Sequence, residues 1–114
     1  MPHDLPLLKV ASAMARHSAN RHGTIAQNIA NADTPGYKAR DLTPFDAMLA
    51  LRDDPSAATG TSREMSVSSV SPNGNSVALD EQMVMASETK IQHETALAIY
   101  RKSMDLLRMG LGRR

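Results

Sequence analysis

The sequence predicts a mainly α-helical protein in which two long amphipathic helices, one at each end of the chain, pack together as a coiled-coil-like pair. Apolar residues recur at alternating three- and four-residue steps near both ends, and a middle rich in Pro, Gly and Ser separates the two patterns. Aromatic residues make up only 3% of the chain while Met occurs eight times, which suits packed helices better than an aromatic-lined pocket. We expect an N-terminal core helix within residues 1–34, a turn, a short helix and a flexible or weakly β middle segment in 35–76, and a C-terminal core helix in 77–114.

The N-terminal helix is predicted over residues 5–30. Pro6 suits a first helical turn, where its missing N–H is not needed. The helix should end before residue 35, because Pro35 disfavours a helical Thr34 and Gly36 readily takes the positive φ of a turn. Its apolar stripe consists of Leu8, Ala11, Ala15, Ser18, His22, Ile25 and Ile29.

The middle of the chain gives weaker signals. A short helix is predicted after Pro44, on an apolar face made by Phe45, Met48 and Leu49. Residues 52–62 are small, polar and without periodicity, so they are predicted to be loop. A short, marginal strand is predicted from the alternation of serines with Met65, Val67 and Val70.

The C-terminal helix is predicted from residue 79 to about 109, with Asn75 or Ser76 as its N-cap. Acidic residues at its start and Arg108 near its end complement the helix dipole. Its stripe comprises Leu79, Met83, Ala86, Lys90, His93, Leu97, Tyr100, Met104, Leu107 and Leu111. We expect this stripe to pack against the N-terminal one, with the helix-packing residues Ile25, Ile29, Met83, Leu97, Tyr100, Met104 and Leu107.

Composition argues against several classes of function. The chain has 114 residues, a formal net charge of +1 and no Cys, so disulfides, thiolate catalysis and Cys-ligated zinc are excluded. The four His residues have no metal-ligand spacing, and no phosphate loop or Ser–His–Asp set is evident. We therefore predict no catalytic, cofactor or metal site, no binding to nucleic acid, no membrane insertion and no cleavable signal peptide.

Two short segments carry a resemblance to a known family. The run Asn-Ile-Ala-Asn-Ala-Asp-Thr-Pro-Gly-Tyr at residues 28–37, continued by Lys-Ala-Arg-Asp, is similar to the signature that flagellar rod proteins carry just after their N-terminal helix. The run Gly-Asn-Ser-Val at residues 74–77 resembles a second segment of that family, which leads into an acidic helix start. The family motif is thus assigned to Asn28, Ile29, Ala30, Asn31, Thr34, Pro35, Gly36, Tyr37, Gly74, Asn75 and Val77.

The resemblance implies a structural subunit of the proximal rod of the bacterial flagellar basal body. It also implies export through the flagellar type III apparatus, self-association, contact with other rod proteins, and a place in the rod where it crosses the periplasm. A cytosolic coiled-coil adaptor or an export chaperone is the alternative reading, since either would share the helical stripes and the low aromatic content.

Several residues admit two roles. Asn28 and Asn31 suit capping of backbone groups at a helix end better than recognition. Tyr37 would either pack back on its own helix or contact the next subunit. Lys90 and His93 interrupt the apolar stripe, either as long side chains that reach solvent or as polar residues that set the register of two helices.

Overall fold

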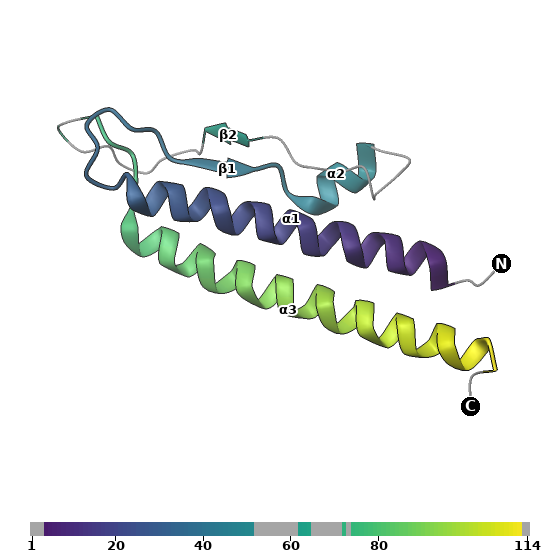
Figure 1. Ribbon diagram of the computed structural model, residues 1–114. Coiled ribbons are helices and arrows are strands. Elements are labelled where there is room, and N and C mark those ends of the chain that lie inside the picture. Colours follow the sequence, from purple (N-terminus) through teal and green to yellow (C-terminus); the bar gives the residue numbers. More distant parts are fainter. Residues whose placement is uncertain (1–3, 52–61, 65–71, 73, 113–114) are drawn as a thin grey trace.

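Two long antiparallel helices form the body of the protein in a computed structural model (Figure 1). The structure describes residues 4–51, 62–64, 72 and 74–112. Helix α1 spans Asp4–Ala30 and helix α3 spans Leu79–Gly110. They lie side by side, with the chain termini at one end of the pair and the turn after α1 at the other. The predicted fold class, with two long terminal helices packed together, is confirmed.

A thin second layer covers one side of α1. It contains strand β1 (Arg40–Leu42), helix α2 (Phe45–Leu51) and strand β2 (Ser62–Glu64), and β1 pairs antiparallel with β2 so that Arg40 lies opposite Glu64. The short helix after Pro44 was predicted. Strand β1 was not, because three residues show no alternation that a sequence pattern can detect. The strand predicted around residues 65–70 lies outside the described residues, and so does the loop predicted at 52–62 except for its last residue, Ser62, which instead begins β2.

The ends of α3 correct one prediction. Neither Asn75 nor Ser76 caps the helix: its N-cap is Ala78, and no side chain bonds to the free N–H groups there. Asn75 and Ser76 are buried and bond to other parts of the chain, as described below. The carboxylates of Asp80 and Glu81 lie in the first turn of α3, where they interact favourably with the positive end of the helix dipole.

The contact between α1 and α3 is made by small and polar residues. On α1 the buried members of the predicted stripe are Ala11, Ser18 and Ile25, whereas His22 and Ile29 are exposed. On α3 the buried residues are Gln82, Met85, Thr89, Ala96 and Ser103. Each of these residues lies one position before a residue of the predicted stripe. The predicted packing face of α3 is therefore wrong, because the face that packs on α1 is displaced from it by one residue along the sequence.

The physical reason for this correction is size. Ala, Ser and Thr allow two helix backbones to approach closely, whereas a seam of long side chains would hold them apart. The larger residues of the predicted stripe therefore lie beside the seam with much of their surface uncovered: Met83 is 59% exposed, Tyr100 39% and Leu97 38%. Ile29 on α1 is 37% exposed, while Met104 and Leu107 are half-buried.

Candidate functional site

The side-chain amide of Asn28 joins three parts of the fold. It is fully buried on α1, and its Nδ2 donates to the carbonyl oxygen of Arg40 at 2.8 Å and to Oε1 of Gln82 on α3 at 2.9 Å. Its Oδ1 accepts from the N–H of Arg40 at 3.1 Å and from the hydroxyl of Tyr37 at 2.9 Å. Because it binds both backbone groups of Arg40, it acts as a strand neighbour to β1. It does not cap the helix, so the capping role holds for Asn31 only.

Asn31 closes the end of α1. Its Nδ2 donates to the carbonyl oxygen of Gln27 at 2.8 Å, and its Oδ1 accepts from the hydroxyl of Thr34 at 3.0 Å. The carbonyl oxygen of Gln27 also accepts the backbone N–H of Asn31 at 3.1 Å, so the side chain reinforces the last turn of the helix, in line with the role predicted for this residue. The backbone oxygen of Asn31 accepts a further bond from the buried amide of Asn75, which lies 44 residues later.

The second motif segment lies directly against the first. Asn75 also donates to the carbonyl oxygen of Thr34, and its Oδ1 accepts from the N–H of Val77 at 2.8 Å. The N–H of Ser76 donates to the carbonyl oxygen of Tyr37 at 2.9 Å, while its Oγ accepts from the N–H of Ala39 at 2.8 Å. The two segments that carried the family resemblance are thus hydrogen-bonded to each other. We call this arrangement of residues 28–40, 74–77 and Gln82 the clasp.

Two glycines make the clasp compact. Gly36 and Gly74 have φ of +77° and +86°, a conformation that L side chains rarely adopt. A Cβ on Gly74 would lie 3.4 Å from the Cα of Gly36, so the two turns touch backbone to backbone. The turn prediction at residues 34–37 is confirmed, and its partner at Gly74 accounts for the Gly in the second motif segment.

Replacing Gly74 with Ala should lower the free energy of unfolding by about 1–2 kcal/mol, since an L residue at positive φ is strained. Gly23→Ala is the matched control: Gly23 lies inside α1, and a Cβ there meets nothing within 4 Å, so the change should stabilise by about 0.5–1 kcal/mol. Urea unfolding followed by circular dichroism gives both values. Effects of the same sign in the two variants would contradict this account.

Tyr37 packs back on its own chain. Its ring is half-buried and its hydroxyl donates to Asn28, which favours the first of the two roles considered for it. Other motif residues lie at the surface: Ala30, Thr34 and Pro35 are exposed, Ile29 is partly exposed, and Val77 is half-buried. The structure therefore brings Asn28, Asn31, Gly36, Tyr37, Gly74 and Asn75 together, and leaves the rest at its rim.

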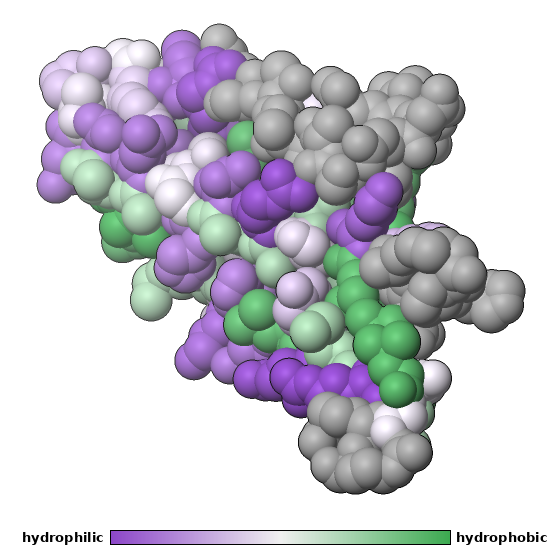
Figure 2. All heavy atoms as spheres, turned by 45° about the vertical axis from the view of Figure 1, so that its right-hand side comes forward, coloured by the Kyte–Doolittle hydropathy of each residue, from purple (hydrophilic) through white to green (hydrophobic). Residues whose placement is uncertain are grey.

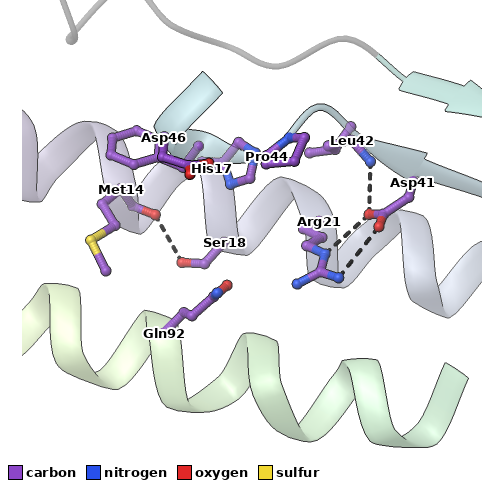
Figure 3. A pocket seen from close by; sticks show the side chains of 10 residues that line it. Met14, His17, Ser18, Arg21, Asp41, Leu42, Pro44, Asp46 and Gln92 are labelled. Carbon is purple, nitrogen blue, oxygen red and sulfur yellow. Dashed lines mark hydrogen bonds and ion pairs between the residues drawn. The ribbon is translucent and has the colours of Figure 1, made fainter. Parts of the chain in front are cut away.

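A hollow of about 400 Å³ lies between α1, the β1–α2 segment and α3 (Figure 3). On its wall, Arg21 forms a two-point ion pair with Asp41, with Nε to Oδ1 at 3.0 Å and Nη2 to Oδ2 at 3.3 Å. Both side chains are largely covered, at 17% and 15% exposure. Nearby, Nε2 of the buried His17 bonds the carbonyl oxygen of Thr43 at 2.8 Å, and its ring packs on Phe45. These contacts hold the second layer on α1.

A Ser–His pair spans the two long helices, yet its hydrogen bonds do not suit catalysis. Nδ1 of His93 lies 3.1 Å from Oγ of Ser18 and 3.2 Å from the carbonyl oxygen of Ala15. The Ser18 hydroxyl is itself directed at the carbonyls of Met14 and Ala15. The Ser18–His93 pair thus joins α1 to α3. Of the two polar residues that interrupt the predicted stripe of α3, His93 makes this contact and Lys90 is exposed to solvent.

An open groove runs between α1 and α3 on the side that carries Leu97. It is lined mainly by apolar surface, from Ser18, Ala19, His22, Thr89, Lys90, His93, Glu94 and Leu97. Leu97, Lys90 and His93 belong to the stripe that was predicted for α3, and His22 to that of α1. The predicted stripes therefore form the walls of a groove rather than a closed seam. Among the described residues, no cluster of His, Asp and Glu has the form of a metal site.

Comparison with known proteins decides the family. Residues 10–38 match the family described as "Flagella basal body rod protein". The protein "Flagellar basal body rod protein FlgB" of Agrobacterium fabrum is 31% identical in an alignment 108 positions long, and the match covers 79% of this chain and 81% of that protein. The chain belongs to the FlgB family of flagellar basal body rod proteins. A second FlgB, from Yersinia enterocolitica, is 28% identical in an alignment 104 positions long, and that match covers 71% of this chain and 75% of the relative.

The two segments that resemble flagellar rod proteins lie in the clasp, whereas the sequence pattern did not indicate Gln82, which joins Asn28 to α3. The family match at residues 10–38 includes Asn28 and Tyr37, which lie in the clasp. Gln82 was given no role and Ser76 was predicted only as a possible N-cap, although both are buried there. On α3, Gln82, Thr89 and Ala96 recur every seven residues and so lie on one face of the helix. This repeat of polar and small residues is the sequence pattern that indicates the buried face of α3.

Proposed function

We propose that this chain is a structural subunit of the proximal rod of the flagellar basal body, which assembles with other rod proteins through its two terminal helices. Membership of the FlgB family carries the proposal. The coiled-coil adaptor and the export chaperone are not favoured, because the relatives with the same sequence pattern are named as rod proteins. A structural family of this kind also argues against an enzyme.

The exposed apolar residues on the helix pair support a role in assembly. Among the described residues, ten large apolar side chains of α1 and α3 remain exposed, including Ile91 at 64% and Met109 at 72%. A helix that is apolar on several sides is normally buried on several sides. We propose that neighbouring rod subunits, including copies of this chain, cover the groove between α1 and α3 and the outer side of α3.

The route to the rod is part of the same proposal. We infer that the chain passes through the flagellar export apparatus without removal of a signal peptide and takes its place where the rod crosses the periplasm. The family resemblance supports this route. None of the described helices combines the length and apolar character of a membrane span.

Deleting the gene should stop flagellar assembly before the rod is complete, so that neither hook nor filament forms. The physical reason is that a rod grows by addition of subunits, and a missing subunit leaves the next one without a surface to bind. Electron microscopy of isolated basal bodies and a swimming assay measure the outcome, and the wild-type gene supplied in trans is the control. Normal filaments in the deletion strain would rule out a rod role.

A further inference from the structure

The two ends of the helix pair carry opposite charge. At the end where the chain termini lie, the exposed charged residues described are Lys9, Arg101, Lys102 and Arg108, against Asp105. At the opposite end, where the turn after α1 meets the start of α3, they are Asp33, Asp80 and Glu81, against Lys38. We call these the basic end and the acidic end. In the described part of the chain, Arg101 and Lys102 have no ion-pair partner.

Helix dipoles explain only part of this polarity. Asp80, Glu81 and Arg108 complement the dipole of α3. Lys9 lies in the second turn of α1, and Asp33 lies three residues beyond its last residue, Ala30, so the dipole of α1, which acts mainly within the first and last turns, accounts for neither charge. Both residues match the charge of their end of the molecule.

Each charged end also exposes apolar side chains. The basic end has Leu7, Leu106, Met109 and Leu111, between 44% and 75% exposed. Figure 2, which brings this end forward, shows hydrophobic and hydrophilic residues next to one another there. The acidic end has Ile29, Leu79, Met83 and Val84, between 37% and 59% exposed. Apolar surface with a charged rim is typical of a protein–protein contact, and the two rims have complementary signs.

We propose that the basic end of one copy of this chain binds the acidic end of a second copy, in a head-to-tail contact. Such a contact joins two different surfaces of the same protein, so it continues from copy to copy without closing. It rests on the proposed function, because it gives the self-association of a rod subunit a direction and a pair of surfaces. The molecule measures 63 × 27 × 17 Å, so an end alone is smaller than the about 800 Å² per partner of a standard interface. The contact must therefore also include residues on the sides of α3 next to each end. We expect the affinity between two isolated copies to be low.

The test uses two charge-reversed forms of the full-length chain. Arg101→Glu with Lys102→Glu makes both ends acidic, and Asp80→Lys with Glu81→Lys makes both ends basic. Each alone should associate about tenfold or more weakly than the wild type in sedimentation velocity at about 0.01 M salt, where charges are little screened. An equal mixture should regain association, because every contact in an alternating chain again joins opposite charges. Wild-type association should fall at about 1 M salt.

Two controls keep the test decisive. Thr95→Lys adds a charge at an exposed position near the middle of α3 and should associate as the wild type does. Thermal melting of each variant by circular dichroism identifies any that fail to fold, and a misfolded variant would not be rescued by mixing. Failure of the two folded variants to rescue each other would overturn the proposal, as would unchanged association of either one.

Cysteine cross-linking gives an independent measurement, since the chain has no Cys of its own. A mixture of Met83→Cys and Met109→Cys copies should form the mixed disulfide faster than either copy links to itself. Preferential Met109→Cys self-linkage would overturn the head-to-tail direction. The proposed function is judged separately: if the wild-type gene restores swimming to the deletion strain while the charge variants associate normally, the rod role stands and only the head-to-tail contact fails.

Discussion

Asn28→Ala should lower the free energy of unfolding by about 3 kcal/mol or more, since each buried polar group left without a partner costs about 1–3 kcal/mol. The substitution removes four hydrogen bonds at once. It leaves the buried amide of Gln82 and the backbone of Arg40 without the partner that Asn28 supplies. A loss of this size is a large fraction of the stability of a small domain.

Asn20→Ala provides the matched control, because Asn20 lies on the same helix with its side chain exposed. An exposed substitution of this kind should change stability by no more than about 0.5 kcal/mol. Urea unfolding of both variants, with the slope compared to that of the wild type, measures the difference. If Asn28→Ala unfolds at the wild-type urea concentration, the clasp does not hold the helices together.

Leu97→Asp should abolish swimming while leaving the isolated chain folded. Leu97 is 38% exposed and lines the groove, so in the monomer a carboxylate there stays in contact with water. Once a neighbouring subunit covers the groove, the same carboxylate is buried without a partner, at a cost of several kcal/mol. The effect is therefore expected on assembly and not on folding.

Glu88→Gln is the comparison for this variant. Glu88 is exposed on α3 and is not one of the residues that line the groove, so its replacement should be nearly silent. Both genes are tested for swimming in the deletion strain, and the exported amount and the melting temperature of each protein are measured separately. Wild-type swimming by Leu97→Asp would show that the groove is not an assembly surface.

The sequence predicts the long helices and the turn well because these depend on local rules. Periodic apolar residues, Pro6 at a first turn and Pro35 with Gly36 at a stop act within a few residues of the chain. They place both helix boundaries within one residue of those observed. The family motif is also a local pattern, and it contains Asn28, Tyr37 and Asn75, whose hydrogen bonds form much of the clasp.

The face of α3 that packs on α1 could not be predicted in the same way. Hydrophobic periodicity ranks positions by apolar character, and it selected Met83 and Leu97 over Gln82 and Ala96. The seam instead depends on backbone approach and on one buried amide pair, Asn28 with Gln82, whose partners are 54 residues apart. In a subunit of an assembly, part of an apolar stripe serves contacts with neighbouring subunits. Those contacts are absent from the structure of a single chain.

The clasp has a consequence for the order in which this chain acquires its structure. Synthesis begins at the N-terminus, so α1 is complete while Gln82 and Asn75, which bond Asn28 and the backbone of Asn31, are still absent. Until then its buried stripe has nothing to pack on, and an isolated amphipathic helix is marginal in water. The N-terminal half of the protein therefore cannot complete its fold until the C-terminal half has been synthesised. We expect a chain truncated before Gln82 to lose the folded structure of α1 as well as that of α3.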